Sequence, residues 1–383
     1  MAHCRVRQYV GRIGLAAIVL ASAGSCRRAS EQPGAGASPA TAPAAAPPSA
    51  GGSPPVTAEA IEDSLLAADQ YFNAGELDKA QAILETLVIR APGDVRAREL
   101  LGQTLIRKAV EADTQLKFDD AAAFRDRAWE QYKAAVAIEP DSPGLRHSAA
   151  MIAHQAGHYD EALANFQVAA SLDPLNPQPA LYAAQLLLAK DRIVEAEAEL
   201  KRAQKLDPDL PLVYASLAVI AMRRADVESA RQLIAQARTL DPYDLGLLAQ
   251  EAGIHRIDGN ARRSLEMLLL LDEPSRANEL VAAEIAGSYL AIGEPLKAAQ
   301  VWVHRIRFLR SYPTRWRDAA RAADAYLAAG DRQSASLWLQ EASLVAPDAE
   351  EVKAVETKLA RPAGDEPPPG GSDEPGAPPD GQG

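Results

Sequence analysis

Residues 143–176 read PGLRHSAAMIAHQAGHYDEALANFQVAASLDPLN, and this stretch decides the fold because its pattern returns along the chain. Small, apolar and proline positions recur at a constant interval, the one that separates Pro140 from Pro174. Four series keep this step: Pro140, Pro174, Pro208 and Pro242; Ala128, Ala162, Ala196 and Ala230; Ala135, Ala169, Ala203 and Ala237; and Ile138, Leu172, Leu206 and Leu240. Coincident series at one period predict a structural unit of about 34 residues, repeated in tandem.

Each repeated position has a physical role if the unit is two helices joined by a turn. Small residues at the eighth and twentieth positions let the two helices cross closely, and the alanine at the twenty-seventh lets the next unit stack. The proline at the thirty-second position cannot continue the second helix and therefore ends the unit. Period and pattern resemble the tetratricopeptide repeat, which implies an all-α fold, a right-handed α-solenoid of helix-turn-helix units.

Extending this register outward predicts about eight units and a short capping helix at 350–360. The predicted units are 61–94, 95–142, 143–176, 177–210, 211–244, 245–278, 279–312 and 316–349. Unit six departs from the pattern, since Ser264 replaces the alanine and Pro274 comes early. Unit seven carries Arg305 where alanine is expected.

Unit two is longer than the period. Thr114 stands where its second helix should carry an alanine, and the alanine that fits the later register is Ala128. The offset between these two positions is about four helical turns, so equal division lengthens both helices by about two turns. The sequence therefore predicts an extended hairpin with Lys117-Phe118-Asp119-Asp120 at its tip and an aspartate as N-cap. The hairpin either contacts a partner or is an extension without a role.

The amino terminus has the order of a secretory signal, predicted at 1–25. Three arginines precede an apolar run at 13–22, and small residues then lead to Cys26. The uncharged run from Ile13 to Cys26 is shorter than the roughly 20 residues that a membrane-spanning helix needs. The end of the signal resembles a bacterial lipobox, which implies lipid attachment at Cys26, although Ala23 stands where that family usually has leucine. The alternative is cleavage near Ala23 or Ser25, which releases a soluble protein.

Composition and charge indicate the character of the remaining segments and the class of partner. Residues 26–58 are rich in Ala, Pro and Gly and predict a disordered tether, and 361–383 predict a disordered acidic tail. The formal net charge is −12, and an acidic body argues against nucleic acid as a partner. We expect an exported protein of the bacterial cell envelope, held at the membrane by its lipid anchor and facing the periplasm.

The resemblance also implies where a partner would bind. In tetratricopeptide repeats, set positions of each first helix line a concave groove. Carried over to this sequence, they predict a protein-binding groove of His147, Met151, His154, Leu181, Gln185, Leu188, Leu212, Val219, Met222, Leu280 and Leu290. This mostly apolar set suits an apolar peptide or an amphipathic helix. The alternative is that tight superhelical winding buries some of these side chains as core.

A second candidate surface is a run of arginines and aromatic residues in units seven and eight. Its predicted basic patch consists of Arg305, Arg307, Arg310, Arg315, Arg317 and Arg321. Arginine beside aromatic residues is a favoured interface composition, and a solvated turn between repeats is the other interpretation. His154 and His158 have a spacing that can hold a metal on one helix, but Gly157 marks a turn between them, so no metal site is predicted.

Three functions fit these features. The first is a non-catalytic scaffold or assembly factor anchored in the cell envelope, which binds a peptide or helix of a protein partner in its groove. The second is a structural subunit of an envelope secretion, export or assembly complex. The third is a carrier of a small ligand or metal at His147, Met151 and His154. We expect no enzyme activity and no cofactor, because phosphate-loop, HExxH and GxSxG patterns do not occur.

Overall fold

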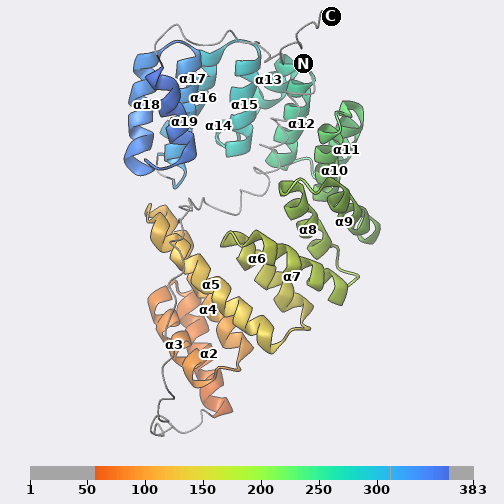
Figure 1. Cartoon of the computed structure of the whole chain (residues 1–383), viewed down its shortest axis with the longest axis vertical. Helices are drawn as coiled ribbons and strands as arrows, with labels where there is room; N and C mark the ends of the chain where they lie inside the picture. Colours follow the sequence, from red (N-terminus) through yellow and green to blue (C-terminus); the bar gives the residue numbers. More distant parts are fainter. Residues whose placement is uncertain (1–56, 311, 362–383) are drawn as a thin grey trace, which may run out of the picture.

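The computed structural model describes residues 57–310 and 312–361, and within these ranges the chain is all-helical. Consecutive helices pack against one another along a strongly curved path (Figure 1). The first helices of the units are α2 (Ala58–Asn73), α4 (Val95–Thr114), α6 (Pro143–Gln155), α8 (Pro177–Ala189), α10 (Pro211–Arg223), α12 (Leu245–Ile257), α15 (Glu279–Ala291) and α17 (Arg315–Ala328). The second helices are α3 (Leu77–Arg90), α5 (Phe118–Ile138), α7 (Tyr159–Leu172), α9 (Ile193–Leu206), α11 (Val227–Leu240), α13 (Ala261–Leu269), α16 (Pro295–Leu309) and α18 (Arg332–Val345). Two further helices are α14 (Glu273–Arg276) and α19 (Glu350–Ala360). The predicted signal, most of the tether and the tail after residue 361 lie outside the described residues.

The helix boundaries follow the repeating prolines. The helices α5, α7, α9 and α11 each end two residues before the proline of their unit, as expected for a residue that cannot continue a helix. In unit three the next residue, Asp173, caps α7 by donating its backbone N–H to the Ala169 carbonyl at 2.9 Å. A second set of prolines opens the first helices α6, α8 and α10 at the first helical position, where their fixed φ is favourable.

The repeating alanines allow neighbouring helices to pack closely, as their small size predicts. Every alanine of the two repeating series is fully buried, with 0% of its surface exposed: Ala128, Ala162, Ala196, Ala230, Ala135, Ala169, Ala203 and Ala237. Gly102 shows the same constraint in unit two, because a Cβ atom there would lie only 2.5 Å from Cε2 of Tyr132. The fold predicted from small residues is confirmed at these contacts.

The turn between the two helices of a unit needs a left-handed residue. In units three to seven the positive φ angle of this turn falls at Gly157, Asp191, Ala225, Gly259 and Gly293, again at the spacing of the repeat. Glycine adopts this conformation without steric cost, whereas Asp191 at φ 58° and Ala225 at φ 60° carry a Cβ atom against the neighbouring backbone. The same turn therefore forms in every unit even where the sequence does not favour it.

One apolar core extends from Ala68 in α2 to Ile254 in α12, and smaller clusters follow it toward the carboxyl end. The large core gives way to the smaller clusters at unit six, whose second helix α13 has only nine residues. Its unusual Ser264 is fully buried and accepts a hydrogen bond from Oγ of Ser288 in α15 at 2.8 Å. Because the buried Ser264 oxygen has this hydrogen-bond partner, serine is tolerated at a position that elsewhere holds alanine.

Both helices of unit two are extended. The helices α4 and α5 have 20 and 21 residues, against 13 and 14 in α6 and α7, so the inserted length is divided equally, as predicted. The predicted aspartate cap is wrong, because α5 begins at Phe118 with Lys117 as N-cap and no side-chain cap bond. Asp119 and Asp120 instead lie in the first turn, where their charges complement the positive end of the helix dipole.

The two ends of the solenoid are finished differently. At the carboxyl end, α19 packs on α17 and α18 and buries Val352 and Val355. At the amino end, α2 buries only Ala68 completely, because no earlier described unit covers it.

The chain also closes on itself, since Phe118 at the hairpin tip packs against the apolar cluster of α17, α18 and α19. In Figure 1 the upper end of α5 accordingly points at the lower ends of these helices.

Candidate protein-binding surfaces

The central part of the predicted groove is core. Leu181 is 1% exposed, Leu188 4%, Val219 8% and Met222 3%, and His154 is also buried. The expectation that these side chains line an open groove is therefore wrong. The physical reason is tight winding: nine of the 13 residues of α10 are buried, and α10 contacts α8 and α12 as well as its partner helices. The first helices of the central units form an inner layer of core.

Part of the predicted groove remains accessible. Leu212 and Leu290 are 43% and 46% exposed. The other members are partly exposed: His147, Met151, Gln185 and Leu280. These residues stay candidates for contact with a partner, because their side chains reach solvent from the first helices of their units.

An aromatic group not predicted from sequence lies between units three and four. The ring of Tyr182 stacks on Phe166 with 5.4 Å between centroids, and His147 lies 5.6 Å from Tyr182 and 5.4 Å from Phe166. Burial lowers the pKa of His147 and that of His154, which lies further along the same helix α6. Both imidazoles are therefore neutral near pH 7. We call the partly exposed residues His147, Met151, Tyr182 and Gln185 the inner strip. Tyr182 was missed because it falls outside the positions assigned to the groove in this family.

The predicted basic patch is mostly an internal network. Arg305 is 6% exposed, forms an ion pair with Asp318 and donates from Nε to the Ala277 carbonyl at 2.8 Å. The hydroxyl of Tyr312 donates to the same Asp318 carboxylate at 2.5 Å. Burial raises the pKa of Tyr312 to about 12 and lowers that of Arg305. The arginine at the position normally occupied by alanine thus fastens unit seven to unit eight.

Three other arginines of the patch are paired with acids on neighbouring helices. Arg315 donates from Nε to Glu341 at 2.9 Å, Arg317 pairs with Glu351 at 3.2 Å and Arg321 donates to Glu279 at 2.9 Å. Arg317 and Arg321 also lie over the rings of Trp316 and Trp302, respectively. The prediction of a six-arginine patch is therefore wrong.

Two arginines of that set are exposed, Arg307 and Arg310. No acid within 57–310 or 312–361 forms an ion pair with either guanidinium. The basic surface that remains is small, and the rest of the network stabilises the junction between units.

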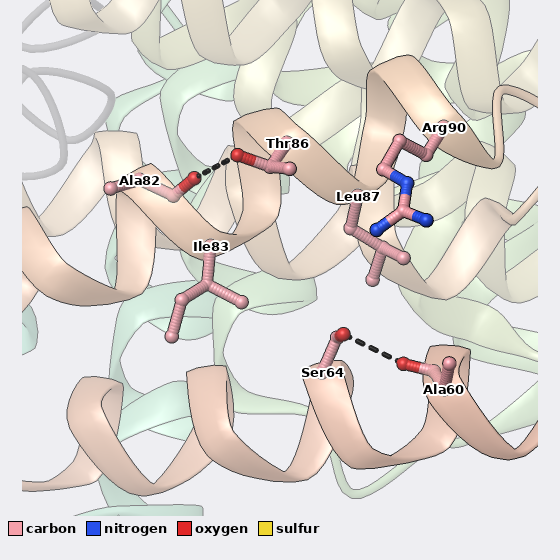
Figure 2. A pocket seen from close by; sticks show the side chains of 7 residues that line it. All are labelled: Ala60, Ser64, Ala82, Ile83, Thr86, Leu87 and Arg90. Carbon is pink, nitrogen blue, oxygen red and sulfur yellow. Dashed lines mark hydrogen bonds between the residues drawn. The ribbon is translucent and has the colours of Figure 1, made fainter. Parts of the chain in front are cut away.

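A cavity of about 330 Å³ lies between α2 and α3 at the amino end of the solenoid. Figure 2 shows its lining: Ala60, Ser64, Ala82, Ile83, Thr86, Leu87 and Arg90. The Ser64 and Thr86 hydroxyls each donate to a carbonyl of their own helix, at 2.7 and 2.9 Å, so the lining is largely apolar. The sequence signal for this cavity is the position of unit one at the start of the array, where no preceding unit among the described residues covers its face.

A second cavity of about 300 Å³ lies beside α5 and is lined by residues with polar or charged side chains. Its lining residues are Asp126, Arg127, Glu130, Gln131 and His158. His158 Nε2 lies 3.1 Å from Oδ1 of Asp126. His158 is the N-cap of α7 whereas His154 belongs to α6, so the two histidines are not on one continuous helix, as predicted.

The described residues contain neither a cluster of metal-binding side chains nor a membrane-spanning helix. No group of three His, Cys, Asp or Glu side chains within these residues could hold a metal ion. No helix among them combines the length and apolar character needed to cross a bilayer. Cys26, the predicted lipid attachment site, lies outside the described residues.

Comparison with known proteins agrees with this architecture. Residues 153–220 match the family model described as tetratricopeptide repeat. A crystal structure of a tetratricopeptide repeat protein from Parabacteroides merdae superposes with a TM-score of 0.54 and 13% identity, covering 79% of this chain and 100% of that chain. The structure of PilW, described as a widely conserved type IV pilus biogenesis factor, gives a TM-score of 0.47 and 18% identity, covering 60% of this chain and 100% of that chain. No curated protein sequence matches the chain.

The repeated helix pairs, the buried small residues and the left-handed turns at the spacing of the repeat define an all-α solenoid. The family match over 153–220 and the superposed structure agree with this fold, which is that of a tetratricopeptide repeat solenoid.

Proposed function

We propose that this protein is a non-catalytic scaffold that binds another protein through side chains on the first helices of its units. The observation that carries the proposal is the inner strip together with Leu212. These residues on α6, α8 and α10 are partly or fully exposed, in a layer that buries many of its other side chains. Solenoids commonly present such surfaces to partners, because their units stack into one extended face.

The chemistry of these residues defines the kind of partner. Tyr182 offers a ring and a phenol, Met151 an adaptable apolar side chain and Gln185 an amide, while His147 is uncharged near pH 7. Apolar side chains with a few polar groups favour a peptide or amphipathic helix whose apolar anchors lie against Met151 and Leu212. Such contacts discriminate little by charge, so salt should affect binding weakly.

Exchange of Leu212 for lysine tests this surface. Leu212 is 43% exposed, so the variant should fold, but a charge there would have to be desolvated when the partner binds. The matched control is Leu337→Lys on α18, where the parent leucine is 63% exposed. After a partner is captured by cross-linking and purified, its dissociation constant should rise at least tenfold for Leu212→Lys and stay within twofold for Leu337→Lys. Equal affinity of both variants would place the interface elsewhere.

We also propose that the scaffold is exported and anchored in the bacterial cell envelope by a lipid on Cys26, facing the periplasm. The support is the order of basic, apolar and small residues that leads to Cys26. Labelling of cells with a radioactive fatty acid should mark the protein, and Cys26→Ser should abolish the label and release the protein from the membrane fraction. An unlabelled parent protein in the soluble periplasmic fraction would contradict lipidation.

A further inference from the structure

The hairpin of unit two ends on a contact with distant units. Phe118, the first residue of α5, is partly buried and packs against the apolar cluster of α17, α18 and α19. This cluster includes Trp316, Leu339 and Val355. Solenoid units ordinarily contact only their neighbours, so a contact between unit two and the carboxyl-terminal units is an added constraint on curvature.

The extra length of the hairpin allows Phe118 to reach the carboxyl-terminal units. Each helix of unit two is seven residues longer than its counterpart in unit three, as their lengths of 20 and 21 against 13 and 14 residues show. At 1.5 Å per residue, seven residues add about 10 Å of reach. A hairpin of ordinary length would therefore end about 10 Å short of the cluster that Phe118 contacts.

The extended part is built as a stiff arm. Ala109, Ala112 and Ala121 form a small buried cluster that lets α4 and α5 lie close together near the tip. Arg125 and Asp113 form an ion pair there, and both residues are buried. Because packing and charge fix the two helices to each other, the position of the tip is set by the body of unit two.

We propose that this hairpin is an intramolecular clasp, in which Phe118 holds the carboxyl-terminal units and keeps the solenoid closed. Among the described residues, Phe118 is the hydrophobic side chain of the hairpin that packs on this cluster, and its ring is only partly buried, so the contact opens and closes without unfolding either part. In the open form the curvature of the array relaxes and its interior widens. This conformational device is independent of which surface binds the partner.

A distance measurement between the hairpin and α18 tests the clasp. Spin labels are placed at Glu111→Cys on α4 and Ser336→Cys on α18, both exposed sites, in the full chain with Cys4→Ser and Cys26→Ser. Pulsed electron resonance should give one narrow distance distribution for the parent. Phe118→Ala and Phe118→Asp should shift it to longer distances and broaden it, and Phe118→Leu should retain most of the closed population.

The matched control is Val110→Ala, an exposed apolar position of the same hairpin (55% exposed) that lies outside the contact. Its distribution should match that of the parent. Far-UV circular dichroism confirms the helix content of each variant, and Phe118→Asp serves as the second disruptive variant where Phe118→Ala alone has a small effect. If both disruptive variants keep the parent distribution, Phe118 does not hold the solenoid closed.

Discussion

Arg305 and Asp318 form an ion pair that joins unit seven to unit eight, with 6% and 0% of the two residues exposed. The pair replaces the alanine contact that joins other units. Taking two charges out of water is costly, and here a carbonyl on one side and the Tyr312 and Arg321 side chains on the other supply further hydrogen bonds. The junction therefore depends on every member of this group.

Removal of one partner should destabilise the junction strongly. Arg305→Met keeps the volume of the side chain but leaves Asp318 buried without its main partner, which costs about 3 kcal/mol or more. Urea unfolding followed by circular dichroism measures the change. The control, Arg307→Met at an exposed position two residues away, should stay within about 0.5 kcal/mol of the parent. Similar losses for both variants would show that the buried pair contributes nothing specific.

Stability should fall as pH is lowered through the range in which histidine titrates. Burial lowers the pKa of His147 and His154 below the ordinary 6.5, so the folded state binds protons less readily than the unfolded state. The stability contributed by the neutral rings is fully present above pH 6.5 and is lost as pH falls toward their folded-state pKa values. Urea midpoints measured from neutral pH down to about pH 5 give this slope.

The double variant His147→Asn with His154→Asn should flatten that slope, because neither side chain titrates. His304→Asn is the control, since the His304 side chain is 52% exposed. If the double variant keeps the parent slope, other groups are responsible for it.

The turn at Ala225 should be improved by glycine. Ala225 has a φ of 60°, which crowds its Cβ atom, whereas glycine meets no such penalty. Ala225→Gly should raise the free energy of unfolding by roughly 0.5–1 kcal/mol, the steric gain being partly offset by the entropy of the unfolded chain. The comparison is Ala329→Gly, at a helical φ of −84°, which should destabilise. A loss of stability with Ala225→Gly would contradict the argument from left-handed geometry.

The repeat was predictable because its determinants are local. The prolines after α7 and α9 end helices whatever the tertiary fold, and alanines such as Ala162 and Ala196 are required wherever two helices cross closely. The extended hairpin followed from counting residues between registers. Its cap was misplaced because Asp119 suits both an N-cap and a first turn, and the sequence alone does not choose between them.

The binding surfaces were less predictable because they depend on how units wind and on residues far apart in sequence. A groove position in one unit does not encode the curvature that buries Leu181 and Met222. The arginine run looked unpaired because its acids, such as Glu279 and Glu341, lie outside the segment that contains the arginines. The contact of Phe118 with the carboxyl-terminal cluster joins units that no periodic pattern connects.

The affinity of a purified partner for the Leu212→Lys and Leu337→Lys proteins tests the central claim most directly. Isothermal titration with each folded variant gives the two dissociation constants under the same salt conditions. The account predicts at least a tenfold weakening for Leu212→Lys alone, since only that residue lies on a first helix in the inner layer. Unchanged binding by Leu212→Lys, or equal weakening by both variants, would contradict a partner site on the first helices.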